Sequence, residues 1–129
     1  MDINFSKEDI AFRDEVRDWL ANDYPKHVKE KTDSGITISK QDLVDFHKAL
    51  SKKGWMGYNW PTEYGGTGWS ASKLYIFNKE LGLAGCPPIL PFGVGMVGPV
   101  IYTFGNDEQK ETFLPDILNF NTWWCQGCL

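Results

Sequence analysis

The residues best suited to chemistry lie at the end of the chain, where Cys125-Gln-Gly-Cys128 forms a C-x-x-C motif. In a thioredoxin-type redox site such a pair opens a helix after a strand, inside a βαβ unit. A structural zinc site needs about four ligands. The third cysteine is Cys86, and neither histidine shows ligand spacing. The motif lacks both sets of surroundings, which argues against a redox or metal function.

Other catalytic patterns are equally weak. His27 lies in a polar stretch without a partner pattern, so a solvated side chain is expected. His47 borders an apolar helical stripe, where a histidine is usually structural, and Glu80 has no second carboxylate for acid/base work. The sequence contains no nucleophile triad, no G-x-G-x-x-G motif and no P-loop. We therefore predict no catalytic residue and no metal site.

Length and composition limit the function classes. The 129 residues suit one domain with a core, with 42% apolar and 15% aromatic residues. A net charge of −4 argues against nucleic-acid binding. The longest apolar stretch, 89–104, contains prolines and glycines and is too short to span a membrane. An acidic, polar start without a signal peptide and an odd number of cysteines predict a cytoplasmic protein.

Helical spacing and capping residues define most elements that must position these side chains. Ser6, Ser39, Ser70 or Ser72, and Asn106 are the expected N-caps. The predicted helices run from Ser6 to about Asp23, over Ser39–Lys53, to about Ala84, in one or two pieces within 89–104, and from Asn106 onward. Pro115 is expected to kink or restart the last helix. The polar, charged stretch Lys26–Ile38 is predicted to be a surface loop.

The segment Trp55–Gly68 is the centre of this arrangement, because it combines four glycines and a proline with several aromatic rings. Each large ring can bury roughly 150–250 Å², so the loop should be packed against the protein. Gly65-Gly66 supplies positive-φ freedom directly after Tyr64. The glycines within 89–104 leave a surface without side chains, which suits either tight helix packing or a slender ligand.

From residue 122 the character changes, since Thr-Trp-Trp-Cys-Gln is typical of a starting strand, yet no partner strand is evident upstream. We therefore predict an all-α fold: an orthogonal or irregular bundle of about five to six helices, ending on the first residues of a β-strand from a missing domain. The expected boundary divides the chain into residues 1–121 and residues 122–129.

Three motifs, in the same order, resemble the N-terminal helical domain of the flavin-dependent acyl-CoA dehydrogenases. They are Trp60-Pro-Thr-Glu-Tyr-Gly-Gly-Thr-Gly, Gly105-Asn-Asp-Glu-Gln-Lys-Glu-Thr-Phe-Leu-Pro and Trp124-Cys-Gln-Gly. The resemblance implies an oxidoreductase that uses FAD for α,β-dehydrogenation of an acyl-CoA thioester. It also implies a fragment, inactive alone, because the family's catalytic Glu lies in a C-terminal domain that this chain lacks.

The resemblance also implies site residues. The segment before Gly105 lines part of the acyl pocket in this family, and the matching positions here are Pro91, Phe92, Gly95 and Met96. The last strand touches the flavin, and its matching positions are Gln126, Cys128 and Leu129. Leu129 lacks the hydroxyl that the family places there. Divergence, a shifted reading frame and a cloning scar are all compatible with this departure.

The expected partners follow from the same resemblance: an acyl-CoA substrate, and an electron-transfer flavoprotein for the complete enzyme. The motifs look most like those of bacterial members that act on bulky or dicarboxylic acyl-CoAs. An alternative is a helical interaction module or subunit that pairs with another chain. In either case, exposed apolar surface should favour self-association.

Overall fold

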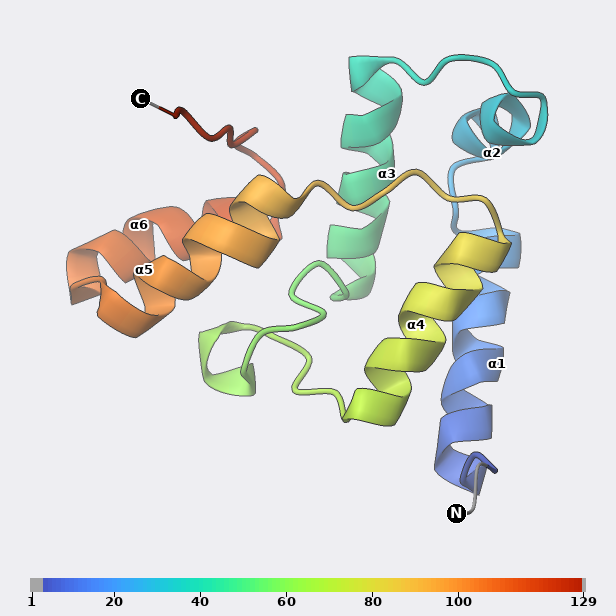
Figure 1. The fold of residues 1–129 in the computed structure, drawn as a ribbon, viewed down its shortest axis with the longest axis horizontal. Helices are drawn as coiled ribbons and strands as arrows, with labels where there is room; N and C mark the ends of the chain where they lie inside the picture. Colours follow the sequence, from blue (N-terminus) through green and yellow to red (C-terminus); the bar gives the residue numbers. More distant parts are fainter. Residues whose placement is uncertain (1–3, 129) are drawn as a thin grey trace. The chain divides into compact units, whose positions relative to one another are not determined.

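The computed structural model describes residues 4–128, and every regular element within them is helical (Figure 1). The elements are α1 (Lys7–Asn22), α2 (Lys26–Asp33), α3 (Lys40–Lys53), the 3₁₀ turn η1 (Thr62–Tyr64), α4 (Ala71–Leu83), the π-helix η2 (Phe92–Val97), α5 (Gly98–Phe104) and α6 (Asp107–Leu118). The prediction of an all-α chain with about five to six helices is confirmed, since the described residues contain α1 to α6. The contacts divide the described residues into two units, 4–46 with 69–87 and 47–68 with 88–128.

In the first unit α1 and α4 lie side by side (Figure 1). Ser6 forms the predicted capping box with Asp9 at the start of α1. Trp69 fills the space between the helices, with its ring centroid 4.8 Å from Phe12 and 5.1 Å from Phe77. This burial of apolar rings holds the pair together.

Two charged pairs tie α1 to α4 as well. Arg17 donates two hydrogen bonds of 3.0 Å, from Nε and from a terminal nitrogen, to the two carboxylate oxygens of buried Glu80. Lys73 donates to Glu8 at 2.7 Å. The bidentate pair explains how the Glu80 carboxylate can be buried on α4, because a buried charge needs a hydrogen-bonded partner.

The prediction of a surface loop over residues 26–38 is wrong for its first half, which forms α2. Pro25 precedes the helix with φ −56°, already close to helical, and Val28 is fully buried. A single buried residue in eight gave too weak a periodic signal to outweigh the polar composition. His27 is not merely solvated either, since its Nε2 lies 2.9 Å from Oδ2 of Asp45 on α3.

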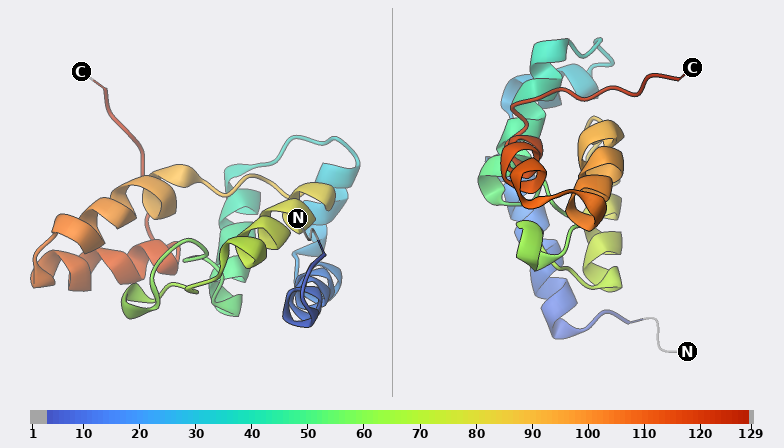
Figure 2. Two further views of the ribbon diagram at one scale, coloured as in Figure 1. Left: turned by 60° about the horizontal axis from the view of Figure 1, so that its bottom comes forward. Right: turned by 90° about the vertical axis from the view of Figure 1, so that its left-hand side faces the viewer.

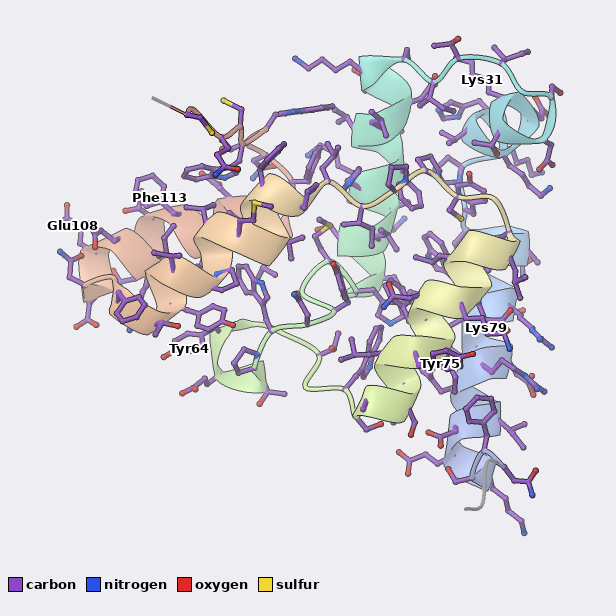
Figure 3. All side chains as sticks on the ribbon, viewed as in Figure 1. Lys31, Tyr64, Tyr75, Lys79, Glu108 and Phe113 are labelled. Carbon is purple, nitrogen blue, oxygen red and sulfur yellow. The ribbon has the colours of Figure 1, made fainter. Side chains whose placement is uncertain are left out.

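In the second unit α5 and α6 run side by side in opposite directions (Figures 1 and 2). The aromatic loop packs as predicted: Trp60 is buried, and the Tyr64 ring stacks on Tyr102 of α5 with centroids 4.9 Å apart. Figure 3 shows Tyr64 reaching from η1 toward α5. A side chain at Gly66 would meet the Trp60 carbonyl oxygen at 2.0 Å, so the loop needs glycine there.

The end of the second unit departs from helical structure as expected. Asn106 and Gln109 cap α6, which continues through Pro115 to Leu118 instead of restarting there. Residues 123–128 follow without helical or paired-strand structure within the described part of the chain. The predicted strand therefore has no partner here, which agrees with the absence of a second strand-forming segment in the sequence.

Candidate functional site

The candidate site begins at η2, the π-helix that precedes α5. The N–H of Gly98 donates to the carbonyl of Gly93, five residues earlier, which is the π-type bond. Such turns are rare and often occur at functional sites, because the extra residue changes which side chains share a helical face. The carbonyl of Val94 within this turn accepts a 2.7 Å hydrogen bond from the buried indole Nε1 of Trp60. The aromatic loop thus fixes the geometry of η2.

A pocket of about 290 Å³ opens against η2 and α5 and against the extended C-terminal segment. Its lining residues are Phe92, Met96, Val97, Val100, Trp124, Cys125 and Gln126. This lining contains no carboxylate, ammonium, guanidinium or imidazole among the described residues. The pocket can therefore hold an apolar group, and it supplies no carboxylate or imidazole of its own.

Two of the four predicted acyl-pocket positions line this pocket, namely Phe92 and Met96. Pro91 and Gly95 are exposed neighbours that do not line it. A Cβ on Gly95 would meet only Pro91, at 3.8 Å, so Gly95 leaves open surface next to Met96. The glycines on either side behave differently: a Cβ on Gly98 would lie 2.3 Å from Trp60, which indicates tight packing there.

The predicted flavin-contacting positions divide in a similar way. Gln126 lines the pocket, whereas Cys128 is exposed and does not. Leu129 lies outside the described residues. Phe92, Met96 and Gln126 are thus the predicted residues that the fold brings together, although more than thirty positions separate the first and the last.

Sequence reasoning missed four lining residues: Val97, Val100, Trp124 and Cys125. Val100 follows Met96 by four residues, so helical spacing from Met96 was a signal for it. Trp124 and Cys125 adjoin Gln126 in the same segment. No pattern indicated that Trp124 would turn toward η2, since that depends on tertiary packing.

Trp124 is the wall residue whose position is best explained. A Cβ on Gly93 would lie 3.2 Å from its Cδ1, so the absent side chain makes room for the indole. Phe113 of α6, labelled in Figure 3, meets the indole edge-on with centroids 5.9 Å apart. The indole Nε1 is buried and has no hydrogen-bond partner within residues 4–128.

A second pocket of about 240 Å³ adjoins the first, because Val100 and Trp124 line both. Its other walls come from α5, α6 and the turn between them, and include Phe104, which is 83% exposed. Monomeric proteins seldom expose large apolar side chains in such groups. The two pockets therefore form one apolar surface that is suited to a large apolar group or to another polypeptide.

The C-x-x-C motif does not form a recognisable redox or metal centre. Cys125 and Cys128 are exposed free thiols in an extended segment, and no helix begins at Cys125 in the described part. No group of three potential metal-ligating side chains occurs in residues 4–128. His47 has a structural role, because it is buried and its Nε2 accepts a 2.9 Å hydrogen bond from the backbone N–H of Leu90.

Comparison with known proteins identifies the family. The model of the acyl-CoA dehydrogenase N-terminal domain matches residues 6–121. The chain belongs to the acyl-CoA dehydrogenase family. It is 32% identical over 121 residues to acyl-CoA dehydrogenase IpdE1 of Mycolicibacterium smegmatis, which covers 90% of this chain and 31% of that protein. Acyl-CoA dehydrogenase FadE26 of Mycobacterium tuberculosis is also 32% identical, covering 91% of this chain and 30% of its own length.

Solved acyl-CoA dehydrogenase structures show the same fold. The ChsE4-ChsE5 complex of Mycobacterium tuberculosis superposes with a TM-score of 0.75 at 31% identity, over 92% of this chain and 29% of that one. The Tcur3481-Tcur3483 steroid acyl-CoA dehydrogenase gives 0.71 at 34% identity, over 92% and 30%. The chain thus spans about a third of the length of these relatives. The family is an FAD-dependent oxidoreductase family in general.

No helix in residues 4–128 combines the length and the apolar character needed to cross a lipid bilayer.

Proposed function

We propose that this chain forms one wall of the acyl and flavin cavity in an FAD-dependent acyl-CoA dehydrogenase. The observation that carries the proposal is the pocket beside η2, whose lining unites Phe92 and Met96 with Gln126. The first two match acyl-contacting positions in the family, and the third matches a flavin-contacting position. Residues 1–121 would form the N-terminal domain, a boundary supported by the end of the family match at residue 121.

The residues at the pocket rim fit a flavin in part. Gln126 is exposed and offers an amide donor and an acceptor, and Trp124 carries a buried indole N–H that lacks an acceptor. The apolar walls suit a flat ring system. The lining contains no hydroxyl group to replace the one that the family uses at position 129. FAD, when bound, would accept the hydride from the β-carbon of the thioester.

The chain's own contribution to the reaction would be to shape the acyl site and to keep water out of it. Phe92, Met96 and Val100 would hold the acyl chain by apolar contact and keep water from the reacting carbons. Since no carboxylate or imidazole lines the pocket, the α-proton would be removed by a residue from elsewhere in the enzyme. The chain alone should therefore be inactive and should not retain FAD.

For the acyl group, the pocket favours a bulky apolar substrate over a dicarboxylic one. Its lining includes no cation that could pair with a second carboxylate, and burying an unpaired carboxylate is costly. The neighbouring 240 Å³ pocket adds room beyond the first. A relative at 34% identity is described as a steroid acyl-CoA dehydrogenase, which supports a ring-bearing acyl group for this chain too.

The second candidate function is association with another polypeptide. Val100 is 55% exposed and Phe104 is 83% exposed, so the apolar surface along α5 is available for a partner or a second copy. Two related structures are named as pairs of different proteins, which supports a partner chain here. An electron-transfer flavoprotein would be the redox partner of the complete enzyme. We also propose a cytoplasmic location.

Ligand titration of the isotope-labelled chain tests the function. Octanoyl-CoA and a steroid acyl-CoA are expected to shift NMR signals of residues 92–100 and 124–126, whereas CoA alone should not. Met96→Trp fills the pocket and should abolish the shifts, while Leu83→Trp, at an exposed position on α4, should leave them intact. Identical shifts with CoA alone, or shifts confined to other residues, would refute an acyl-binding pocket.

FAD binding and activity are tested separately. The chain mixed with FAD and desalted should lose all flavin absorbance, and it should not oxidise acyl-CoA with an artificial electron acceptor. Stoichiometric flavin retention would show that the chain forms a complete cofactor site, contrary to the proposal. A dimer that dissociates on dilution to a well-folded monomer would weaken the case for an obligate partner.

A further inference from the structure

A groove of about 510 Å³ lies between η1 and α6, and it shares no lining residue with the acyl pocket. It is lined from η1 and the following glycine by Glu63, Tyr64 and Gly65, and from α6 and its C-cap by Asp107, Lys110, Glu111, Leu114, Pro115, Leu118 and Asn119. Both sides belong to the second unit. The groove is therefore a separate feature of the second unit, distinct from the pocket beside η2.

The floor of the groove is apolar and well fixed. Leu118 lies four residues after Leu114 and three after Pro115, so each shares a helical face with it and the three form one strip along α6. The methyl groups of Leu118 lie where side chains on Gly57 or Gly65 would be, since a Cβ would come within 2.9 Å and 2.7 Å of them. Leu118 is therefore packed against the glycine loop and only half-buried, Leu114 is 5% exposed, and Pro115 is exposed, so Pro115 and the free edge of Leu118 form the accessible apolar surface.

The rim of the groove is acidic. Glu63, Asp107 and Glu111 are exposed, and none of the three carboxylates forms an ion pair within residues 4–128. The only cation of the lining is Lys110, whose Nζ lies 5.4 Å from the centroid of the Tyr64 ring in a cation–π contact. Three carboxylates against one ammonium leave the groove with two uncompensated negative charges.

The backbone of α6 adds an acceptor at the same place. Pro115 has no amide hydrogen, so it cannot donate to the carbonyl of Glu111 four residues earlier. A helical carbonyl beside the acidic rim thus lacks its usual donor. A carbonyl oxygen without a donor can accept a hydrogen bond from the ammonium or guanidinium group of a ligand.

We propose that the η1–α6 groove docks a basic amphipathic segment of a partner protein. An aliphatic side chain of that segment lies on Pro115 and Leu118, while lysine or arginine side chains donate to Glu63, Asp107 and Glu111. Charge complementarity selects this occupant, because nucleic acids and anionic membrane surfaces are repelled by the rim. An uncharged apolar segment would leave the carboxylates without compensation.

The test is a titration of the full chain with a short amidated peptide built from leucine and lysine. The wild-type chain should bind it saturably, with NMR shifts at residues 63–65 and 107–119, and the affinity should fall as salt is raised. The same peptide with glutamate in place of lysine should not bind. The double variant E63Q/E111Q should bind roughly fivefold more weakly, because two partly exposed charge pairs are lost.

A matched variant separates the groove from net charge. E30Q/E108Q neutralises two exposed carboxylates that do not line the groove, one of them on the same first turn of α6 (Figure 3), and should keep wild-type affinity. P115A restores an amide donor within α6 and should weaken binding without unfolding the chain. Equal losses in both double variants, shifts at other residues, or self-association without peptide binding would each overturn the proposal.

Discussion

The indole Nε1 of Trp60 donates a 2.7 Å hydrogen bond to the backbone carbonyl of Val94, thirty-four residues away and in the middle of the π-helix. Both groups are buried, so neither can turn to water if the other is removed. The bond connects the glycine-rich aromatic loop to the turn that carries Phe92 and Met96 of the 290 Å³ pocket. The aromatic loop and the η2 wall of the pocket are therefore joined by a buried hydrogen bond.

Removing this donor should be costly. Trp60→Phe keeps an aromatic ring but leaves the Val94 carbonyl without its donor, which should lower the free energy of unfolding by about 1–3 kcal/mol. Urea denaturation followed by circular dichroism measures the change. Trp123→Phe, at an exposed ring, is the control and should shift the midpoint little. Equal losses in both variants would contradict a special role for the Trp60 bond.

The same substitution at two glycines should have opposite effects. At Gly98 an added Cβ would lie 2.3 Å from Cζ2 of Trp60, so Gly98→Ala should destabilise the chain by about 1–3 kcal/mol. At Gly82 in α4 nothing lies within 4 Å, and Gly82→Ala should stabilise it by about 0.5–1 kcal/mol. Thermal unfolding of both variants checks the signs, and a stable Gly98→Ala protein would mean that Trp60 can move freely.

Stability at high pH should depend on Tyr24. Burial raises the pKa of its hydroxyl from 10.0 to about 12; the Thr32 and Cys86 side chains lie near enough to influence that pKa, but neither forms a hydrogen bond of good geometry with the hydroxyl. Above pH 10 the unfolded chain loses the phenolic proton first, so the folded state should lose stability between about pH 10 and 12. Tyr24→Phe should remove that loss.

The same change should also stabilise the chain near neutral pH by about 1 kcal/mol, because it removes a buried polar group without a partner. Denaturant titrations at neutral and alkaline pH measure both effects. Tyr75→Phe, at an exposed ring, should have neither. An unchanged alkaline limb in Tyr24→Phe would assign the high-pH instability to another group.

Acid stability should depend on Asp42. Hydrogen bonds from Lys31 at 2.7 Å and from the Ser39 backbone at 2.9 Å lower the pKa of the Asp42 carboxyl from 3.8 to about 2. The unfolded state therefore binds a proton first, and the contribution of Asp42 to stability is complete above about pH 4 and lost as the pH falls toward 2.

Asp42→Asn should remove that dependence and lower stability at neutral pH, since the neutral amide cannot pair with Lys31. Thermal midpoints between pH 2 and 6 provide the measurement, with Asp18→Asn on the exposed face of α1 as the control. A wild-type pH dependence in Asp42→Asn would show that other carboxylates dominate acid unfolding.

The sequence predicted those parts of the fold whose signals come from residues close together in the chain. Ser6 with Asp9, and Asn106 with Gln109, cap their helices as predicted, because both partners lie within one turn. The α2 helix was missed, because only Val28 of its eight residues is buried. The π-turn at η2 was also not predicted, and the Trp60 bond that meets it joins residues thirty-four positions apart, beyond the reach of local spacing.

The sequence by itself determined the helical class, the packed aromatic loop and the family, since capping residues, periodicity and short motifs are all local properties of the chain. Only the tertiary structure decided which predicted residues meet. It brought Phe92 and Met96 to Gln126 and turned Trp124 into the pocket, and it left Pro91, Gly95 and Cys128 outside the lining. The physical reason is that a pocket is formed by side chains distant in sequence, whose meeting depends on packing and not on spacing.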